Sequence, residues 1–327
     1  MARTSKAEAP SRPLASAPTQ LSEAVLAGLR KSPKQLSPVW FYDELGSVLF
    51  DQICELPEYY VTRTELAIMQ EHATEMGQHI GPHAALIEYG SGTSLKTRLL
   101  LDHLELPSIY VPVDIARTHL LDAAGALARD YPTLRIAPVC ADFTQPFELP
   151  AHAAVANRRV VYFPGSTIGN FEADAARQLL RSIHTLVGSG GAALIGVDLK
   201  KDPRVLERAY NDSAGVTAEF NLNALRHLNR ELGTDFHIDA FKHEACWVEA
   251  HSRIEMHLVS REDQTVHVGE DTISIRRGER LLTECCHKYT LESFAQLAAG
   301  AGFQTERVWT DAQSLFSVQL LQPRRLQ

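Results

Sequence analysis

Five short apolar runs between residues 84 and 198 constrain the fold of this chain more than any other feature. Turn residues bound each run, and helical patterns such as 118–130 and 173–187 lie between them. Runs of this length are typical of strands buried on both faces, and parallel strands need helix-length crossovers. The runs are Ala84–Tyr89, Ser108–Asp114, Leu134–Val139, Arg159–Phe163 and Ala192–Asp198. The alternation predicts an α/β fold with a doubly wound parallel sheet.

The pattern changes after Asp198. Two helical patterns occupy residues 203–232, and stretches that alternate apolar with polar residues follow, as in an antiparallel meander. These stretches are Ala245–Val248, Arg253–Val259, Thr265–Val268 and Thr272–Arg276. The chain ends with a helix at Leu291–Ala299 and two strands at Glu306–Thr310 and Phe316–Leu321, which suit closure of the first sheet. We therefore expect a second, α+β unit to be inserted after the fifth strand.

Composition and charge exclude several classes of protein. Apolar residues make up 45% of the chain and charged residues 22%, as in globular enzymes. The net charge of −8, without a basic cluster, argues against nucleic-acid binding. No apolar run is long enough to span a membrane, and the N-terminus lacks the core of a signal peptide. Residues 1–20, rich in Ala, Ser and Pro, predict a mobile tail.

Cysteine and histidine spacing bears on compartment and metals. The five cysteines are odd in number and form no CxxC pair, which favours a reducing compartment, and we expect a cytoplasmic protein. The adjacent Cys285 and Cys286 cannot face the same side of a strand. The 14 histidines show no HxH or HExxH spacing, so no metal site is predicted.

A glycine-rich turn after the first apolar run indicates a nucleotide-type cofactor. Gly90 and Gly92 match the first two glycines of the dinucleotide fingerprint, but Leu95 stands where the third belongs. Asp114 ends the second run, where it suits ribose hydroxyls, and the pair Asp142-Phe143 follows the third, where it suits adenine. The incomplete fingerprint favours S-adenosylmethionine over NAD, although each feature alone also fits an ordinary turn or helix cap.

The segment FPGSTIGNF, residues 163–171, follows the fourth run and borders the expected ligand site. Asn170 can both donate and accept hydrogen bonds, which suits a substrate that carries an amino group and a carboxylate. Spacing alone fits an asparagine that caps the next helix equally well.

Six segments in order resemble one known family, the L-histidine Nα-methyltransferases of ergothioneine biosynthesis. They are WFYDELGSVLFDQICELPEYYVTRTE, EYGSGTSLKTRLLL, FPGSTIGNF, DLKKDPRVLERAYNDSAGVTAEFN, RIEMHL and LLTECCHKY. The resemblance covers about residues 38 to 321. It implies a Rossmann-like methyltransferase core that uses S-adenosylmethionine, and trimethylation of free histidine to hercynine. It also implies a methyltransferase domain of residues 64–200 and 288–327, and a substrate-binding domain of residues 21–63 and 201–287.

The resemblance assigns a site residue by residue. The cofactor would be bound by Tyr42, Gly90, Lys96, Asp114, Asp142 and Phe143. The substrate would be bound by Tyr59, Gly165, Thr167, Asn170, Tyr210, Met256, Glu284 and Cys286, with Tyr59 and Asn170 as the catalytic pair. Without the resemblance, Tyr59 and Met256 fit a role in packing, and Glu284 fits an edge-strand charge.

One position departs from the family pattern. Cys286 stands where the family has a serine that hydrogen-bonds the imidazole, and a thiol is a weaker donor and acceptor. We expect weaker histidine binding, with Glu284 kept as the charged partner of an imidazole N–H. Three alternatives stay open: the same chemistry on another amino acid such as tryptophan or tyrosine, an NAD-dependent oxidoreductase, and a non-catalytic binding protein. A free amino acid is the expected partner, without nucleic acid or membrane, and a monomer is favoured.

Overall fold

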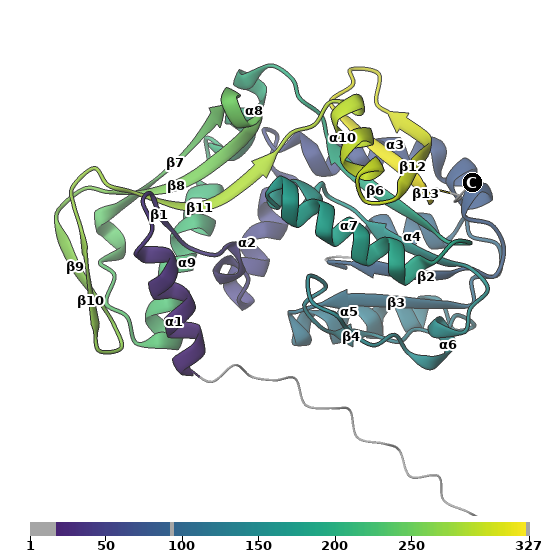
Figure 1. Ribbon diagram of the computed structural model, residues 1–327, viewed down its shortest axis with the longest axis horizontal. Helices are drawn as coiled ribbons and strands as arrows, with labels where there is room; N and C mark the ends of the chain where they lie inside the picture. Colours follow the sequence, from purple (N-terminus) through teal and green to yellow (C-terminus); the bar gives the residue numbers. More distant parts are fainter. Residues whose placement is uncertain (1–17, 92–94, 325–327) are drawn as a thin grey trace, which may run out of the picture.

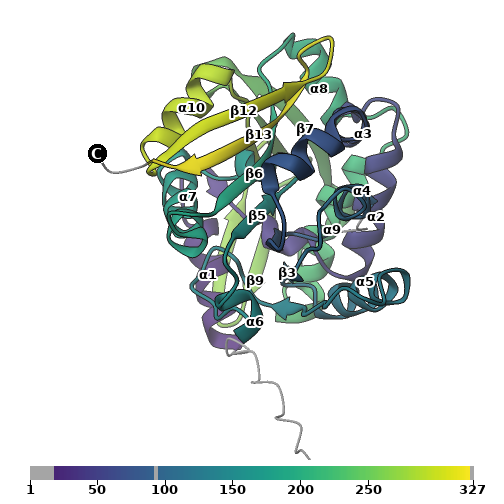
Figure 2. The ribbon, with the colours of Figure 1, turned by 90° about the vertical axis from the view of Figure 1, so that its right-hand side faces the viewer.

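A computed structural model describes residues 18–91 and 95–324. Its larger sheet has seven strands in the order β12-β13-β6-β5-β2-β3-β4 (Figures 1 and 2). The strands are β2 (Ala85–Tyr89), β3 (Ile109–Asp114), β4 (Val139–Cys140), β5 (Arg159–Phe163), β6 (Ala192–Asp198), β12 (Phe303–Thr310) and β13 (Phe316–Pro323). β2 to β6 are parallel, whereas β13 is antiparallel to both β6 and β12.

Helices cover both faces of this sheet because its central strands are apolar on both sides. Leu86 of β2 packs in one core cluster and Ile87, the next residue, in the other, as expected of alternating side chains. The first cluster lies under α3 (Tyr60–Ile80), α4 (Leu95–Leu101) and α5 (Arg117–Asp130). The second lies under α6 (Ala151–Ala154), α7 (Ala173–Val187) and α10 (Leu291–Ala299).

A second sheet lies beside the first, with the order β1-β11-β8-β7 (Figure 1). Its strands are β1 (Lys34–Gln35), β7 (Phe241–Val248), β8 (Arg253–Ser260) and β11 (Arg280–His287), and β9 (Gln264–Val268) pairs with β10 (Asp271–Ile275) as a separate hairpin. The accompanying helices are α1 (Pro18–Leu29), α2 (Glu44–Glu55), α8 (Pro203–Tyr210) and α9 (Val216–Leu232). Short 3-10 turns are η1 (Pro38–Phe41), η2 (Thr167–Asn170), η3 (Ile238–Ala240) and η4 (Glu249–His251).

The predicted strands and helices are largely present, with two corrections. β5, β6, α7 and α10 have the predicted bounds, and β12 and β13 join the first sheet as expected. The third run, predicted as a strand over 134–139, is reduced to β4 and an isolated bridge at Ile136, because Pro138 has no N–H to donate to a sheet. The predicted meander is present only in part: β7 pairs with β8 and β9 with β10, both antiparallel, but the second neighbour of β8 is β11 and not β9. Of the predicted tail, residues 1–17 lie outside the described residues, whereas residues 18–20 form the start of α1 and are not a tail.

The two sheets approach closely at η2, which belongs to the turn after β5. Gly169 of η2 lies so near β11 that an added Cβ would be 2.6 Å from the carbonyl oxygen of His287. The imidazole Nδ1 of His287 is in turn 3.0 Å from the carbonyl oxygen of Gly169. Only a residue without a side chain permits this approach, which also positions Asn170, the next residue.

We expect G169A to lower the free energy of unfolding by about 1–3 kcal/mol, because the added methyl group overpacks the contact between η2 and β11. G125A in α5 is the matched control. Its Cβ would approach other atoms no closer than 4.0 Å, so it should leave stability unchanged or raise it by about 0.4–1 kcal/mol. Denaturant unfolding of both variants measures the difference, and equal stability would contradict this account of the contact.

Candidate active site

One cavity of about 550 Å³ lies where the carboxyl ends of β2, β3, β5 and β6 face β8 and β11 of the second sheet. Its volume falls in the range of about 300–1,000 Å³ usual for small-molecule sites. The predicted site residues that line it are Tyr42, Tyr59, Gly90, Asp114, Asp142, Phe143, Gly165, Thr167, Asn170, Tyr210, Met256, Glu284 and Cys286. Residues far apart in the sequence thus meet at one place, as ligand sites do in open α/β sheets.

The cofactor end of the cavity is built by the turns after β2, β3 and β4. Gly90 has a φ of 73° and open space where a Cβ would lie, which leaves its backbone free to contact a ligand. Asp114 is half-buried at the end of β3, and burial raises its pKa. Asp142 is exposed, and its Oδ1 accepts hydrogen bonds from the N–H and the hydroxyl of Thr144. These residues fit an adenosine-containing cofactor. The predicted Gly92 lies outside the described residues.

Phe143 forms part of an aromatic wall at this end. Its ring stacks on Tyr89 with 5.0 Å between centroids and an interplanar angle of 15°. Phe163 of β5 packs edge-on against both rings. The wall fixes the orientation of Phe143, which lines the cavity and offers apolar surface to a planar base.

Lys96 is positioned differently from the other predicted residues. It is absent from the described lining of the cavity, and its Nζ lies 2.5 Å from Oε2 of Glu65, which is fully buried on α3. The same carboxylate accepts a 2.9 Å hydrogen bond from the N–H of Gly165. Lys96 therefore helps to hold the turn after β5 through Glu65. Its predicted contact with the cofactor stays a prediction.

The substrate end combines polar and apolar side chains from both sheets. The amide Nδ2 of Asn170 donates a 3.0 Å hydrogen bond to Oε1 of Glu284 on β11. Met256 of β8 pairs with Glu284 in the strand register, so its thioether side chain borders the same end. Tyr59, at the start of α3, packs edge-on against Tyr210, with 6.2 Å between ring centroids. An amino group, a ring N–H and an apolar ring edge would each meet a suitable partner here.

Burial raises the pKa of Glu284 to about 7, against 4.5 for an ordinary glutamate, although Lys288 opposes this shift. The charged form of Glu284 is therefore disfavoured in the empty protein. A ligand that donates a hydrogen bond to this carboxylate offsets the free-energy cost of its desolvation. Cys286 lies two residues further along β11 and is buried, whereas Cys285 points away and is partly exposed. All five cysteines lie in the described part of the chain and are free.

A buried charge cluster that sequence reasoning missed stands behind the substrate end. Asp198, at the end of β6, accepts 2.8 Å hydrogen bonds from the hydroxyl of Tyr60. It also pairs with the ammonium groups of Lys201 at 2.5 Å and Lys288 at 2.7 Å. Burial alone would raise the pKa of Asp198, but the two lysines hold it below its ordinary value. Asp198 and Lys288 both line the cavity.

A signal for this cluster is present in the sequence. Asp198 is a charged residue that directly ends an apolar run, and Lys201 and Lys288 lie in the segments DLKK and LLTECCHKY. Each charge alone also fits the exposed end of a strand. The pairing of Asp198 with Lys288 depends on the contact of the two sheets, which spacing along the chain does not show.

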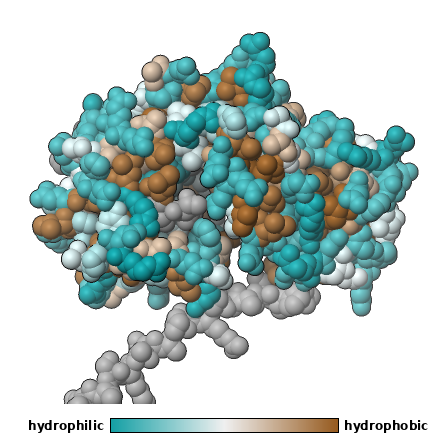
Figure 3. All heavy atoms as spheres, turned by 180° about the vertical axis from the view of Figure 1, so that it is seen from behind, coloured by the Kyte–Doolittle hydropathy of each residue, from teal (hydrophilic) through white to brown (hydrophobic). Residues whose placement is uncertain are grey.

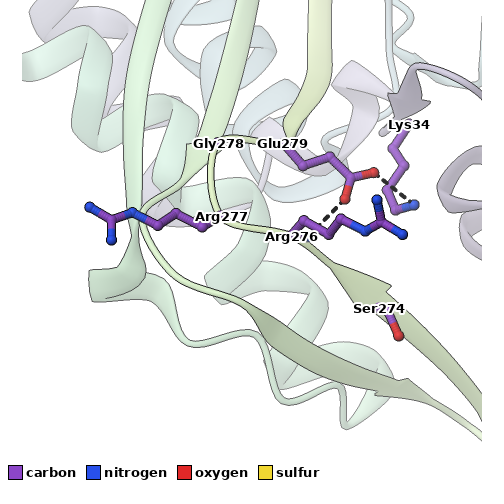
Figure 4. A pocket seen from close by; sticks show the side chains of 6 residues that line it. All are labelled: Lys34, Ser274, Arg276, Arg277, Gly278 and Glu279. Atoms are coloured by element: carbon purple, nitrogen blue, oxygen red, sulfur yellow. Dashed lines mark hydrogen bonds and ion pairs between the residues drawn. The ribbon is translucent and has the colours of Figure 1, made fainter.

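Other surface features do not form a comparable site. A shallow hollow of about 580 Å³ at the edge of the second sheet is lined by Lys34 and the turn 276–279, and Arg277 points away from it (Figure 4). Its Lys34 already pairs with Glu279 at 2.9 Å. Seen from behind, apolar side chains gather in separate groups on a largely hydrophilic surface (Figure 3). Within residues 18–91 and 95–324 no helix is long and apolar enough to cross a membrane, and no three potential ligands cluster around a metal position.

The sheet order with its one reversed strand, β13, and the cavity at the carboxyl ends of the parallel strands define a Rossmann-like methyltransferase dependent on S-adenosylmethionine. A family model described as "Histidine-specific methyltransferase, SAM-dependent" matches residues 21–323. The chain belongs to this family, which confirms the resemblance seen in the sequence.

Named relatives agree with the assignment. Over 310 residues the chain is 42% identical to histidine N-alpha-methyltransferase of Mycolicibacterium smegmatis, a match that covers 93% of this chain and 95% of the relative. The protein of the same name from Mycobacterium tuberculosis is also 42% identical, with 92% and 94% covered. Ergothioneine biosynthesis protein 1 of Neurospora crassa is 31% identical over 86% of this chain and 32% of that longer protein. The oxidoreductase and non-catalytic alternatives do not fit this family.

We expect E284Q to stabilise the empty protein at pH 8 by on the order of 1–2 kcal/mol. The raised pKa of Glu284 means that the folded state holds a proton that the unfolded state releases between about pH 4.5 and 7. Stability contributed by this group is therefore lost as pH rises through that window. Glutamine removes the charge and keeps an acceptor for Asn170.

Unfolding of wild type and E284Q, followed from pH 4.5 to 8, measures this effect. The two proteins should have nearly equal stability at pH 4.5 and diverge toward pH 8. A constant difference across the range would show that Glu284 does not titrate inside it. E279Q serves as the matched control, because Glu279 lies on the outer edge of the second sheet and its pKa is lowered.

Proposed function

We propose that this protein transfers methyl groups from S-adenosylmethionine to the α-amino nitrogen of free L-histidine, up to hercynine, in ergothioneine biosynthesis. The observation that carries the proposal is the pair Asn170–Glu284 at the substrate end of the cavity. It offers an amide to an amino group and, beside it, a half-buried carboxylate to a ring N–H. Family membership and the relatives named histidine N-alpha-methyltransferase support histidine as the substrate.

The bound cofactor supplies an electrophilic methyl group on a sulfonium. The chain's own residues hold the acceptor: Asn170 and Tyr59 orient the α-nitrogen so that its lone pair faces the methyl carbon. The amine must first lose a proton, which it can release to solvent water. Positioning of this kind supplies about 7–11 kcal/mol in favourable cases. Gly165, which has no side chain, leaves room for methyl groups already added.

The remaining assignments belong to the same proposal. The enzyme is cytoplasmic, acts on a free amino acid as a monomer, and binds neither nucleic acid nor membrane. Residues 64–200 and 288–327 form its methyltransferase domain, and residues 21–63 and 201–287 form its substrate-binding domain. The net charge of −8 and the division of strands between two sheets support these assignments.

Titration of single amino acids into the protein preloaded with S-adenosylhomocysteine tests the substrate. We expect heat of binding from L-histidine, and mass spectrometry of turnovers with S-adenosylmethionine should show gains of one, two and three methyl groups. Binding of tryptophan or tyrosine in place of histidine would agree with an amino-acid methyltransferase but contradict histidine as its substrate. Absence of binding by any amino acid, with S-adenosylhomocysteine still bound, would contradict a free amino acid as substrate.

N170A should lower kcat about a hundredfold, since a misplaced amine loses the orientation that the amide provides. Affinity for S-adenosylhomocysteine should stay within about twofold of wild type, because Asn170 lies at the substrate end. N157A, at an exposed asparagine after α6, is the matched control and should retain full activity. A parallel loss of cofactor affinity in N170A would indicate a folding defect in place of a lost substrate contact.

A further inference from the structure

Lys288 is a fully buried cation in the wall of the cavity, and it carries no role in the proposed function. It follows directly on β11. Its Nζ lies 2.7 Å from Oδ2 of Asp198, 2.9 Å from the hydroxyl of Tyr210 and 3.0 Å from Sγ of Cys286. An ammonium has three protons, so each proton has one partner. Lys288 therefore has no proton left for a substrate, and it can act on one only through these neighbours.

Tyr210 is the neighbour through which such an action would pass. Its ring is buried at the end of α8, and the ammonium of Lys288 lies 4.9 Å from the ring centroid. Because the hydroxyl oxygen accepts a proton from Lys288, its own O–H must point elsewhere. In this structure it donates to Sγ of Cys286 at 3.0 Å. A thiol is a weak acceptor, so an anionic ligand competes readily for this O–H.

Hydrogen bonds also fix the backbone of Tyr210. The carbonyl oxygen of Tyr210 accepts a 2.8 Å hydrogen bond from Nε2 of His243 on β7. Nδ1 of the same imidazole accepts from the amide of Asn221 on α9, at 2.8 Å. Burial lowers the pKa of His243, so the ring is neutral and this donor–acceptor order is fixed. With the backbone fixed, the contact with Lys288 decides where the Tyr210 O–H points.

We propose that Lys288 is a positioning residue that gives the site its selectivity for substrates with a free α-carboxylate. Its ammonium turns the Tyr210 hydroxyl toward the cavity and polarises that O–H as a hydrogen-bond donor. The inference rests on the proposed function, since it concerns the carboxylate of the amino-acid substrate. It assigns Cys286 a part in the same arrangement, as the weak acceptor that the carboxylate displaces.

The structure offers a matched pair of variants, K288M and K201M. The side chain of Lys201 is also largely buried and also pairs with Asp198, but its remaining hydrogen bond goes to Tyr60 and not to Tyr210. Each variant removes one positive charge from the cluster and leaves Asp198 paired with the other lysine. A difference between the two variants therefore isolates the contacts of Lys288 with Tyr210 and Cys286.

The experiment compares the affinities of L-histidine and L-histidinamide for protein preloaded with S-adenosylhomocysteine. The amide has the same shape but no carboxylate charge. We expect wild type and K201M to bind histidine more tightly than histidinamide. In K288M the ratio of the two affinities should fall at least about tenfold, the effect expected for loss of a charged hydrogen bond. Affinity for S-adenosylhomocysteine should stay within about twofold in all three proteins, which shows that they are folded.

The outcomes separate this inference from the proposed function. If wild type binds neither ligand, the proposed function fails. If wild type prefers histidine and K288M keeps that preference, or if K201M loses it equally, the positioning role of Lys288 is overturned. Should K288M not bind S-adenosylhomocysteine, K288R replaces it. Its guanidinium keeps the charge but holds its N–H groups in one plane, so it cannot reproduce the arrangement of the three ammonium protons of Lys288. The preference for histidine should therefore still fall, and full retention would overturn the inference.

Discussion

The buried carboxylate of Asp198 joins three segments of this protein that are remote in sequence. It ends β6 of the first sheet and binds Tyr60 at the start of α3, Lys201 in the turn that follows β6, and Lys288 after β11 of the second sheet. A buried charge without partners costs several kcal/mol, so the folded protein must supply Asp198 with at least one cationic partner. The substrate end of the cavity exists because this cluster holds the second sheet against the end of β6.

A second buried carboxylate, Glu65, does the same for the turn after β5. It binds the N–H of Gly165 and the ammonium of Lys96, and it fits only because Gly196 on β6 has no side chain. A Cβ at Gly196 would lie 2.3 Å from its Oε1. α3, which carries both Tyr60 and Glu65, thus aligns two turns of the first sheet with β11. Both carboxylates support the positions of side chains that face the ligand.

Much of the architecture follows from local patterns. The apolar run Ala192–Asp198 and the amphipathic pattern Ala173–Val187 predict β6 and α7 residue for residue, because continuous burial and helical periodicity leave strong signals. Family motifs predicted thirteen positions that line the cavity, although the roles of these residues stay predictions. The sequence misled where Pro138 shortens the predicted edge strand, and where alternation alone could not distinguish the partners of β8.

By itself, the sequence determined the parallel core, the order of the turns that carry Gly90, Asp114 and Asn170, and the family to which the chain belongs. These features depend on interactions within a few residues or on motifs that stay intact in the sequence. Only the tertiary structure decided that Lys96 turns to Glu65, that Asp198 pairs with Lys288, and that Lys288 binds Tyr210 and Cys286. Charged side chains are long and can pair with many partners, so their choice depends on which elements pack together and exclude water.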